Sequence, residues 1–221
     1  MFEAVIFDVD GTIVDSVELH AKAWQDAFEK FGKYIDLQTM HDQIGKGGDQ
    51  ILPTFLSKDE IKLFGEKMKE YRSEHFKKNY LPKVKPFSRV RDLFQRIKND
   101  GKKIGIGSSA HEDELHHYLK LCNVEDLADI STCADDADKS KPHPDIFEVA
   151  LSKLGETPER TLVIGDSPYD AEAAGKISMR TIGFLCGGFG REVLEKAGVI
   201  DIFESPSDLL QKYADSVLAA R

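Results

Sequence analysis

The chain has 221 residues, enough to bury a sizeable hydrophobic core as one large domain or as a domain with an insert. Hydrophobic residues make up 41% of it and charged residues 31%, which is typical of a globular protein. Its formal net charge of −9 argues against a broadly basic surface for nucleic acid, and no apolar run approaches the roughly 18 residues that span a bilayer, so we expect neither nucleic acid nor a membrane as a partner.

The first predicted element is a short buried strand, AVIF at residues 4–7, which runs directly into DVDGT at 8–12. A strand alternates its faces, so Asp8 and Asp10 should leave its carboxyl end on the same side, and Gly11 lets the backbone turn sharply. Two acids on one side of a turn can hold a divalent cation and also act on a substrate.

The next segment reads as helical. Asp15 and Ser16 can both cap a helix that ends near Gly32. Its apolar stripe recurs at spacings of four and three through Val17, Ala21, Trp24, Phe28 and Phe31. Further helical patterns follow around residues 40–44, 50–55 and 57–79, and no convincing strand is predicted between residues 12 and 102.

From residue 87 onward, short apolar runs alternate with helices. Ser88 is predicted to cap the first of these helices. Strands are predicted at 103–107, 129–132, 161–165, 180–184 and 199–202. Helices are predicted at 111–122, 144–154, 169–174, 190–197 and after Pro206.

This alternation predicts an α/β fold with a Rossmann-like parallel sheet covered by helices on both faces. The first strand belongs to that sheet. The simplest organisation is a core made of residues 1–14 and 86–221, with a small all-helical domain, residues 15–85, inserted after the first strand.

Ligands of an open parallel sheet bind beyond the carboxyl ends of its strands, so the residues that follow each strand are considered together. Those that carry reactive or polar side chains are Asp8, Asp10, Thr12, Ser108, Ser109, Asp166 and Asp170. A further candidate, Lys141, lies in the loop SKPHPDIF, where Pro142 and Pro144 stiffen the backbone. Carboxylates, hydroxyls and a lysine are therefore expected at one edge of the sheet.

These groups suit the transfer of a phosphoryl group. The hard oxygen ligands of Asp8 and Asp166 favour Mg²⁺, which would neutralise carboxylates that repel each other and an incoming phosphate. One carboxylate could then attack phosphorus to give an aspartyl phosphate. Lys141, Ser108 and Thr12 would stabilise charge on the transferring oxygens.

The ordered set of motifs resembles the haloacid dehalogenase superfamily, and more narrowly its phosphoglycolate phosphatase and β-phosphoglucomutase group. DVDGT (8–12) is similar to the superfamily's first motif, Ser108 to the hydroxyl of the second, Lys141 to the lysine of the third and GDSPYD (165–170) to the acidic fourth. The resemblance covers essentially the full length. It implies a helical cap domain that closes over the active site.

The resemblance also implies a role for each motif residue. Asp8 would be the nucleophile and a magnesium ligand, and Asp166 a further ligand. Asp10 would protonate the leaving group, later activate water, and give its backbone carbonyl to the metal. Lys141 would pair with Asp8 and the phosphate, and Asp170 would orient Lys141 or a metal-bound water.

In the cap, His20 and Trp24 match positions that face the substrate in related proteins, although Trp24 also fits the apolar stripe of its helix. The loop IGKGGDQ (44–50) falls where such caps carry their specificity residues. Lys46 is the candidate phosphate contact there. β-Phosphoglucomutases typically place an arginine in this loop, and its absence here disfavours a mutase.

We therefore expect a Mg²⁺-dependent phosphatase acting on a small phosphorylated metabolite such as phosphoglycolate or a sugar phosphate. A sugar phosphomutase and, less favoured, a non-catalytic phosphate-binding protein are the alternatives. Three widely spaced cysteines and no signal-like start predict a cytoplasmic protein with free thiols. We expect a monomer or a weak homodimer.

Overall fold

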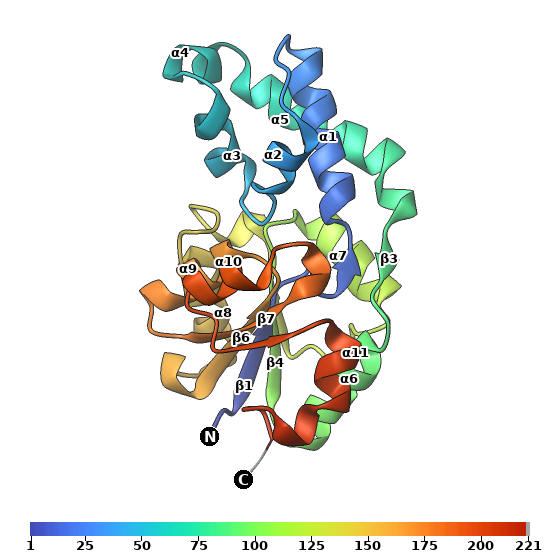
Figure 1. Ribbon diagram of the computed structural model, residues 1–221, viewed down its shortest axis with the longest axis vertical. Coiled ribbons are helices and arrows are strands. Elements are labelled where there is room, and N and C mark those ends of the chain that lie inside the picture. The colour runs from blue at the N-terminus through green and yellow to red at the C-terminus, as the bar shows by residue number, and fades with distance from the viewer. Residues whose placement is uncertain (220–221) are drawn as a thin grey trace.

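The computed structural model describes residues 1–219 and is built around a sheet of six parallel strands in the order β5-β4-β1-β6-β7-β8 (Figure 1). These strands are β1 (Ala4–Phe7), β4 (Lys103–Gly107), β5 (Ile130–Thr132), β6 (Thr161–Gly165), β7 (Arg180–Phe184) and β8 (Asp201–Phe203). The first strand lies in the middle of the sheet, where Phe7 pairs with Ile106 on one side and Ile164 on the other. The residues that follow β1, β4 and β6 therefore meet at one edge.

Helices cover both faces of the sheet. They are α6 (Val90–Asn99), α7 (Glu112–Leu121), α8 (Asp145–Leu154), α9 (Pro168–Lys176), α10 (Arg191–Lys196) and α11 (Pro206–Gln211). Alternate side chains of β1 enter different cores: Val5 and Phe7 pack with residues of α6 and α7, whereas Ile6 packs with residues of α8 and α9. The predicted α/β class with a parallel sheet is confirmed.

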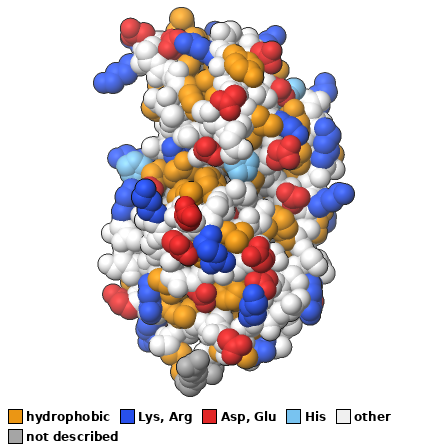
Figure 2. Space-filling view, in the orientation of Figure 1, with side chains coloured by type: hydrophobic (Ala, Val, Ile, Leu, Met, Phe, Trp, Pro, Cys, Tyr) orange, Lys and Arg blue, Asp and Glu red, His pale blue; other side chains and the backbone are white. Residues whose placement is uncertain are grey.

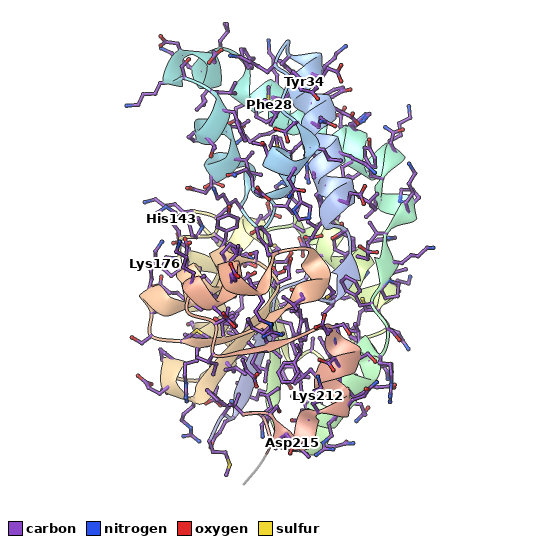
Figure 3. All side chains as sticks on the ribbon, viewed as in Figure 1. Phe28, Tyr34, His143, Lys176, Lys212 and Asp215 are labelled. Carbon is purple, nitrogen blue, oxygen red and sulfur yellow. The ribbon has the colours of Figure 1, made fainter. Side chains whose placement is uncertain are left out.

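Between β1 and the rest of the sheet, the chain forms a helical layer, here called the cap, at the carboxyl edge of the strands (Figure 1). It contains α1 (Val17–Lys30), α2 (Leu37–His41), α3 (Gly48–Phe55), α4 (Lys58–Glu60), a π-helical turn (Ile61–Gly65) and α5 (Glu66–Asn79). A separate hydrophobic cluster that includes Trp24 and Phe28 holds these helices together. Figure 3 places Phe28 and Tyr34 on this layer, with Tyr34 at its outer end. The domain boundaries at residues 14/15 and 85/86 stay a prediction.

The prediction that no strand lies between residues 12 and 102 was wrong. β2 (Val14–Asp15) and β3 (Lys85–Pro86) form an antiparallel pair where the chain enters and leaves the cap. Two residues are too few for an alternating pattern, so this pair depends on a contact between distant parts of the chain.

Three predicted helix starts also differ in detail. The N-cap position of α6 is Arg89 with φ 65°, rather than Ser88, and no side chain caps that helix. Ser16 does precede α1, but its hydroxyl makes no capping bond. The helix predicted around 40–44 is α2, which starts earlier because Asp36 caps it through the backbone N–H of Thr39 at 2.9 Å.

Short 3₁₀ turns complete the described chain at 81–83, 134–136, 158–160, 185–187 and 213–215. Acidic and basic side chains are interspersed over the face seen in Figure 2. The three cysteines are free thiols. In residues 1–219, every helix is too short or too polar to cross a membrane.

Candidate active site

Three buried carboxylates meet at the carboxyl edge of the sheet. Asp8 follows β1, Asp166 follows β6, and Asp170 lies in the first turn of α9; one oxygen from each falls within 4.8 Å of the others. Glycine permits this crowding, because a Cβ at Gly11 or Gly187 would overlap the carboxylate of Asp166. The predicted convergence of the strand ends is therefore present in the structure.

Lys141 inserts its ammonium group among these carboxylates. Its Nζ donates to Asp8 and, at 2.7 Å, to Asp170, and its side chain is only 1% exposed. Lys176 at the end of α9 holds the loop that carries it, by donating to the carbonyl oxygen of Pro142 at 2.6 Å. Figure 3 places Lys176 and His143 on the part of the core that adjoins the cap. Lys141 thus contacts Asp170 as well as Asp8, and the predicted role of Asp170 in orienting Lys141 or a metal-bound water stays a prediction.

Burial governs the protonation of this cluster. It raises the pKa of Asp8 to about 7, although the nearby Lys141 opposes the rise. Burial, together with the charges of Asp8 and Asp170, also raises the pKa of Asp166 above its ordinary range. For Lys141 the two carboxylates outweigh burial and raise the pKa of the ammonium group. When all three carboxylates are ionised, their charge exceeds what one lysine can balance.

The donor set fits Mg²⁺, because three carboxylates supply hard oxygen ligands and repel one another without a second cation. The predicted ligands Asp8 and Asp166 both belong to this cluster. Its third carboxylate is Asp170, because the side chain of Asp10 points elsewhere. The predicted contribution of the Asp10 backbone carbonyl stays a prediction.

Asp10 faces the start of the cap. Its Oδ1 accepts hydrogen bonds from the hydroxyl of Ser16 at 2.5 Å and from Nε2 of His20 at 2.7 Å. Burial opposes ionisation of Asp10, but His20 and Ser16 together lower its pKa. Ser16 therefore uses its hydroxyl on this carboxylate rather than as a helix cap.

Two predicted phosphate contacts lie outside the cavity. The hydroxyl of Thr12 lies 3.1 Å from Asp8 Oδ2 and 3.2 Å from Asp166 Oδ1. Ser108 is fully buried, and its Oγ accepts the backbone N–H of Ala110 at 3.0 Å. Neither side chain lines the cavity between the cap and the core, so contact with a phosphate stays a prediction for both.

A cavity of about 120 Å³ separates the cap from the core. It is lined by seven of the predicted residues: Asp8, Asp10, His20, Trp24, Lys46, Ser109 and Lys141. The volume is well below the roughly 300–1,000 Å³ of sites for drug-sized ligands, so we expect a small substrate.

Sequence reasoning missed three charged residues of this cavity: Lys69, Arg72 and Glu114. A signal for Arg72 was present, because it lies one helical turn from each of Met68 and Phe76, the two buried residues of α5. A charge in the middle of a buried stripe indicates a site rather than a solvated face. Glu114 gave a weaker signal, since acids are common in the first turn of a helix.

The family model described as haloacid dehalogenase-like hydrolase matches residues 5–184. The chain belongs to this family. It is 28% identical over 208 residues to pyrophosphatase PpaX of Bacillus pumilus, covering 93% of this chain and 94% of the relative. It is 30% identical over 173 residues to a phosphorylated carbohydrates phosphatase of Thermotoga maritima, covering 78% of this chain and 80% of the relative.

Among solved structures, this hydrolase is similar to one described as a hydrolase from Pseudomonas syringae. The TM-score is 0.87 at 26% identity, and the match covers 96% of this chain and 98% of the other. The predicted superfamily, fold and enzyme class are confirmed: the chain is a haloacid dehalogenase-type phosphatase. The predicted residue roles stay predictions.

Proposed function

We propose that this phosphatase hydrolyses small phosphate compounds with Mg²⁺, through a phosphoaspartyl intermediate on Asp8. The observation that carries the proposal is the ion-paired Asp8, which is joined to Lys141 and lines a small cavity together with Asp10. A carboxylate in contact with a buried ammonium group is held in place for attack, and the same ammonium group can bind a phosphate oxygen.

Each further step is assigned to a residue of this chain. Asp8, Asp166 and Asp170 would hold Mg²⁺, which when bound offsets their charge and that of the phosphate. Asp8 attacks phosphorus, and Asp10 in its protonated form gives a proton to the leaving oxygen. Asp10 then takes a proton from the water that hydrolyses the aspartyl phosphate, a role for which its contact with His20 positions it.

The substrate class is narrowed by the cavity and by the relatives. A cavity of about 120 Å³ favours metabolites with few atoms. Phosphoglycolate and sugar phosphates are the substrates we expect from the motifs. Pyrophosphate joins them because a relative is named a pyrophosphatase.

A panel of these compounds tests the proposal with purified protein, with Mg²⁺ and with a chelator. Asp8→Asn should abolish turnover, and Asp10→Asn should lower kcat by about 10²–10⁴-fold. Asp15→Asn is the matched control, because Asp15 is an exposed acid in the same stretch. Full activity of Asp8→Asn would overturn the mechanism.

Product analysis separates this proposal from a sugar phosphomutase. A phosphatase releases one inorganic phosphate for each ester consumed. A mutase instead converts the ester into an isomer and needs a bisphosphate activator. Conversion of a sugar phosphate without release of inorganic phosphate would therefore show that the protein is a mutase and not a phosphatase.

A further inference from the structure

The two walls of the cavity carry opposite charge. The residues that the cap contributes are His20, Trp24, Ile44, Gly45, Lys46, Gly47, Gly48, Lys69, Arg72 and Ser73. They include three cations and no carboxylate. The core contributes three carboxylates, from Asp8, Asp10 and Glu114, and one lysine. A ligand that spans the cavity therefore meets positive charge at its cap end.

Two of the cap cations already have partners. Lys46 donates to Gln43 at 2.7 Å and lies 4.5 Å from the ring centre of Tyr169. Lys69 pairs with Glu66 at 2.8 Å on the outside of α5. Both ammonium groups therefore already have an interaction partner before a ligand binds.

Arg72 is different, because its guanidinium lies against aromatic rings and has spare donors. Its centre is 5.3 Å from the ring of Trp24 and 5.1 Å from that of Phe76, and one amino group contacts Nδ1 of His20. Its Nε is buried without a hydrogen-bond partner. Within residues 1–219 no carboxylate comes within 4.0 Å of it. A buried cationic donor without an acceptor is costly unless a ligand supplies one.

We propose that Arg72 binds a second anionic group of the substrate, a phosphate or a carboxylate carried a few bonds from the phosphoryl group that is transferred. This inference rests on the proposed phosphatase function and makes Arg72 a specificity residue. Because the cavity is small, the second anion lies close to the first. Guanidinium geometry matches either anion through two parallel hydrogen bonds.

Glu114 favours the same orientation of the ligand. Its carboxylate lies on the core wall, where it accepts the hydroxyl of Tyr118 at 3.1 Å and lies 3.7 Å from Nε2 of His20. A second anion placed beside Glu114 would be repelled. The cap wall around Arg72 is therefore the place for it.

The contact between Arg72 and His20 offers a competing role. Arg72 could serve only to position His20, which in turn contacts Asp10. Loss of a positioning residue would weaken every substrate alike. Loss of a specificity residue would weaken only those that carry the second anion, and this difference makes the proposal testable.

Non-hydrolysable phosphonates provide the test, by titration calorimetry of the full chain with Mg²⁺. Phosphonoacetate and phosphonoacetamide have nearly the same shape, but only the first carries a second anion. The wild type should bind phosphonoacetate at least about ten-fold more tightly, as expected for a charge-assisted hydrogen bond. Methylenediphosphonate distinguishes a second phosphate from a carboxylate as the preferred group.

Arg72→Met should bring the ratio of the two affinities close to one, whereas Arg72→Lys should keep part of it. Arg89→Met is the matched control, because Arg89 is an exposed arginine that pairs with Asp92 and does not line the cavity. Circular dichroism checks that each variant is folded. If Arg72→Met does not fold, the ratio of the two affinities in the wild type and in Arg72→Lys still tests the proposal.

Equal affinities in the wild type, or an equal loss of both ligands in Arg72→Met, would overturn the role of Arg72. If the panel esters are hydrolysed at the same time, the proposed function stands without it. Failure of every phosphonate to bind, together with no hydrolysis of any ester, would overturn both. The two failures are thus distinguishable.

Discussion

Lys141 is the cation on which the buried carboxylate cluster depends. It is 1% exposed and bonded to Asp8 and Asp170. Removing one partner of a buried ion pair leaves uncompensated charge, whereas an exposed pair contributes little.

Lys141→Met should therefore lower the free energy of unfolding by about 3–5 kcal/mol in magnesium-free buffer. Lys153→Met is the matched control: Lys153 pairs with Asp136 on the surface, and its loss should cost less than about 1 kcal/mol. Urea unfolding above neutral pH measures both. Equal losses for the two variants would show that the cluster does not need its lysine.

The motif residues could be predicted from the sequence because their spacing follows strand ends, which a parallel sheet brings together whatever its side chains are. Asp8 and Asp166 meet for this reason, whereas Lys141 reaches them from the loop before α8. Arg72 could not be placed in the same way. Its place between Met68 and Phe76 indicates a site, but its distance from the core depends on how far the cap approaches, which no local pattern of residues encodes.

Two contacts, one at the start of α3 and one at the end of α2, hold the cap against the core. Asp49 accepts the backbone N–H of Ser140, beside Lys141, at 3.2 Å. From the core, the hydroxyl of Tyr169 donates to the carbonyl oxygen of Asp42. These contacts tie the cap to the loop that carries Lys141 and to α9.

Asp49→Ala should open the cap, because it removes the acceptor for Ser140, whereas Asp49→Asn keeps an acceptor oxygen and is the matched control. One hydrogen bond shifts the ratio of closed to open forms by about five-fold. Trp24 is the only tryptophan, lines the cavity and is 4% exposed. Acrylamide should therefore quench Asp49→Ala more strongly. Identical quenching of the two variants would contradict a closing role for this contact.

The main strands and helices of the core could be predicted because each carries its own periodicity or caps. The pair β2 and β3 could not, since each strand has two residues and is defined by its distant partner. The start of α6 at a residue with φ 65° likewise has no side-chain cap to mark it. Elements held by tertiary contacts are the ones that local patterns miss.

The buried carboxylate cluster links magnesium, pH and stability. Burial raises the folded-state pKa of Asp8 from 3.8 to about 7, so the folded metal-free protein binds a proton more tightly than the unfolded chain. This contribution to stability is present below the unfolded pKa and is lost as the pH rises through about 7.

Mg²⁺ binds only the deprotonated carboxylates, so the rise in Tm caused by magnesium should grow between about pH 5 and pH 8. Asp8→Asn removes one of the proposed ligands and should reduce that rise at high pH. Differential scanning fluorimetry with magnesium or chelator measures it. A magnesium effect that is the same at both pH values would contradict binding at this cluster.

The central claim is that the phosphoryl group passes through Asp8. The most direct test is to quench the reaction with acid during turnover, reduce the protein with borohydride and analyse the tryptic peptide 1–22 by mass spectrometry. That peptide also contains Asp10 and Asp15, which serve as internal controls. Reduction should convert Asp8 alone to homoserine. Phosphate release without modification of Asp8, or with modification of Asp10 instead, would contradict the mechanism.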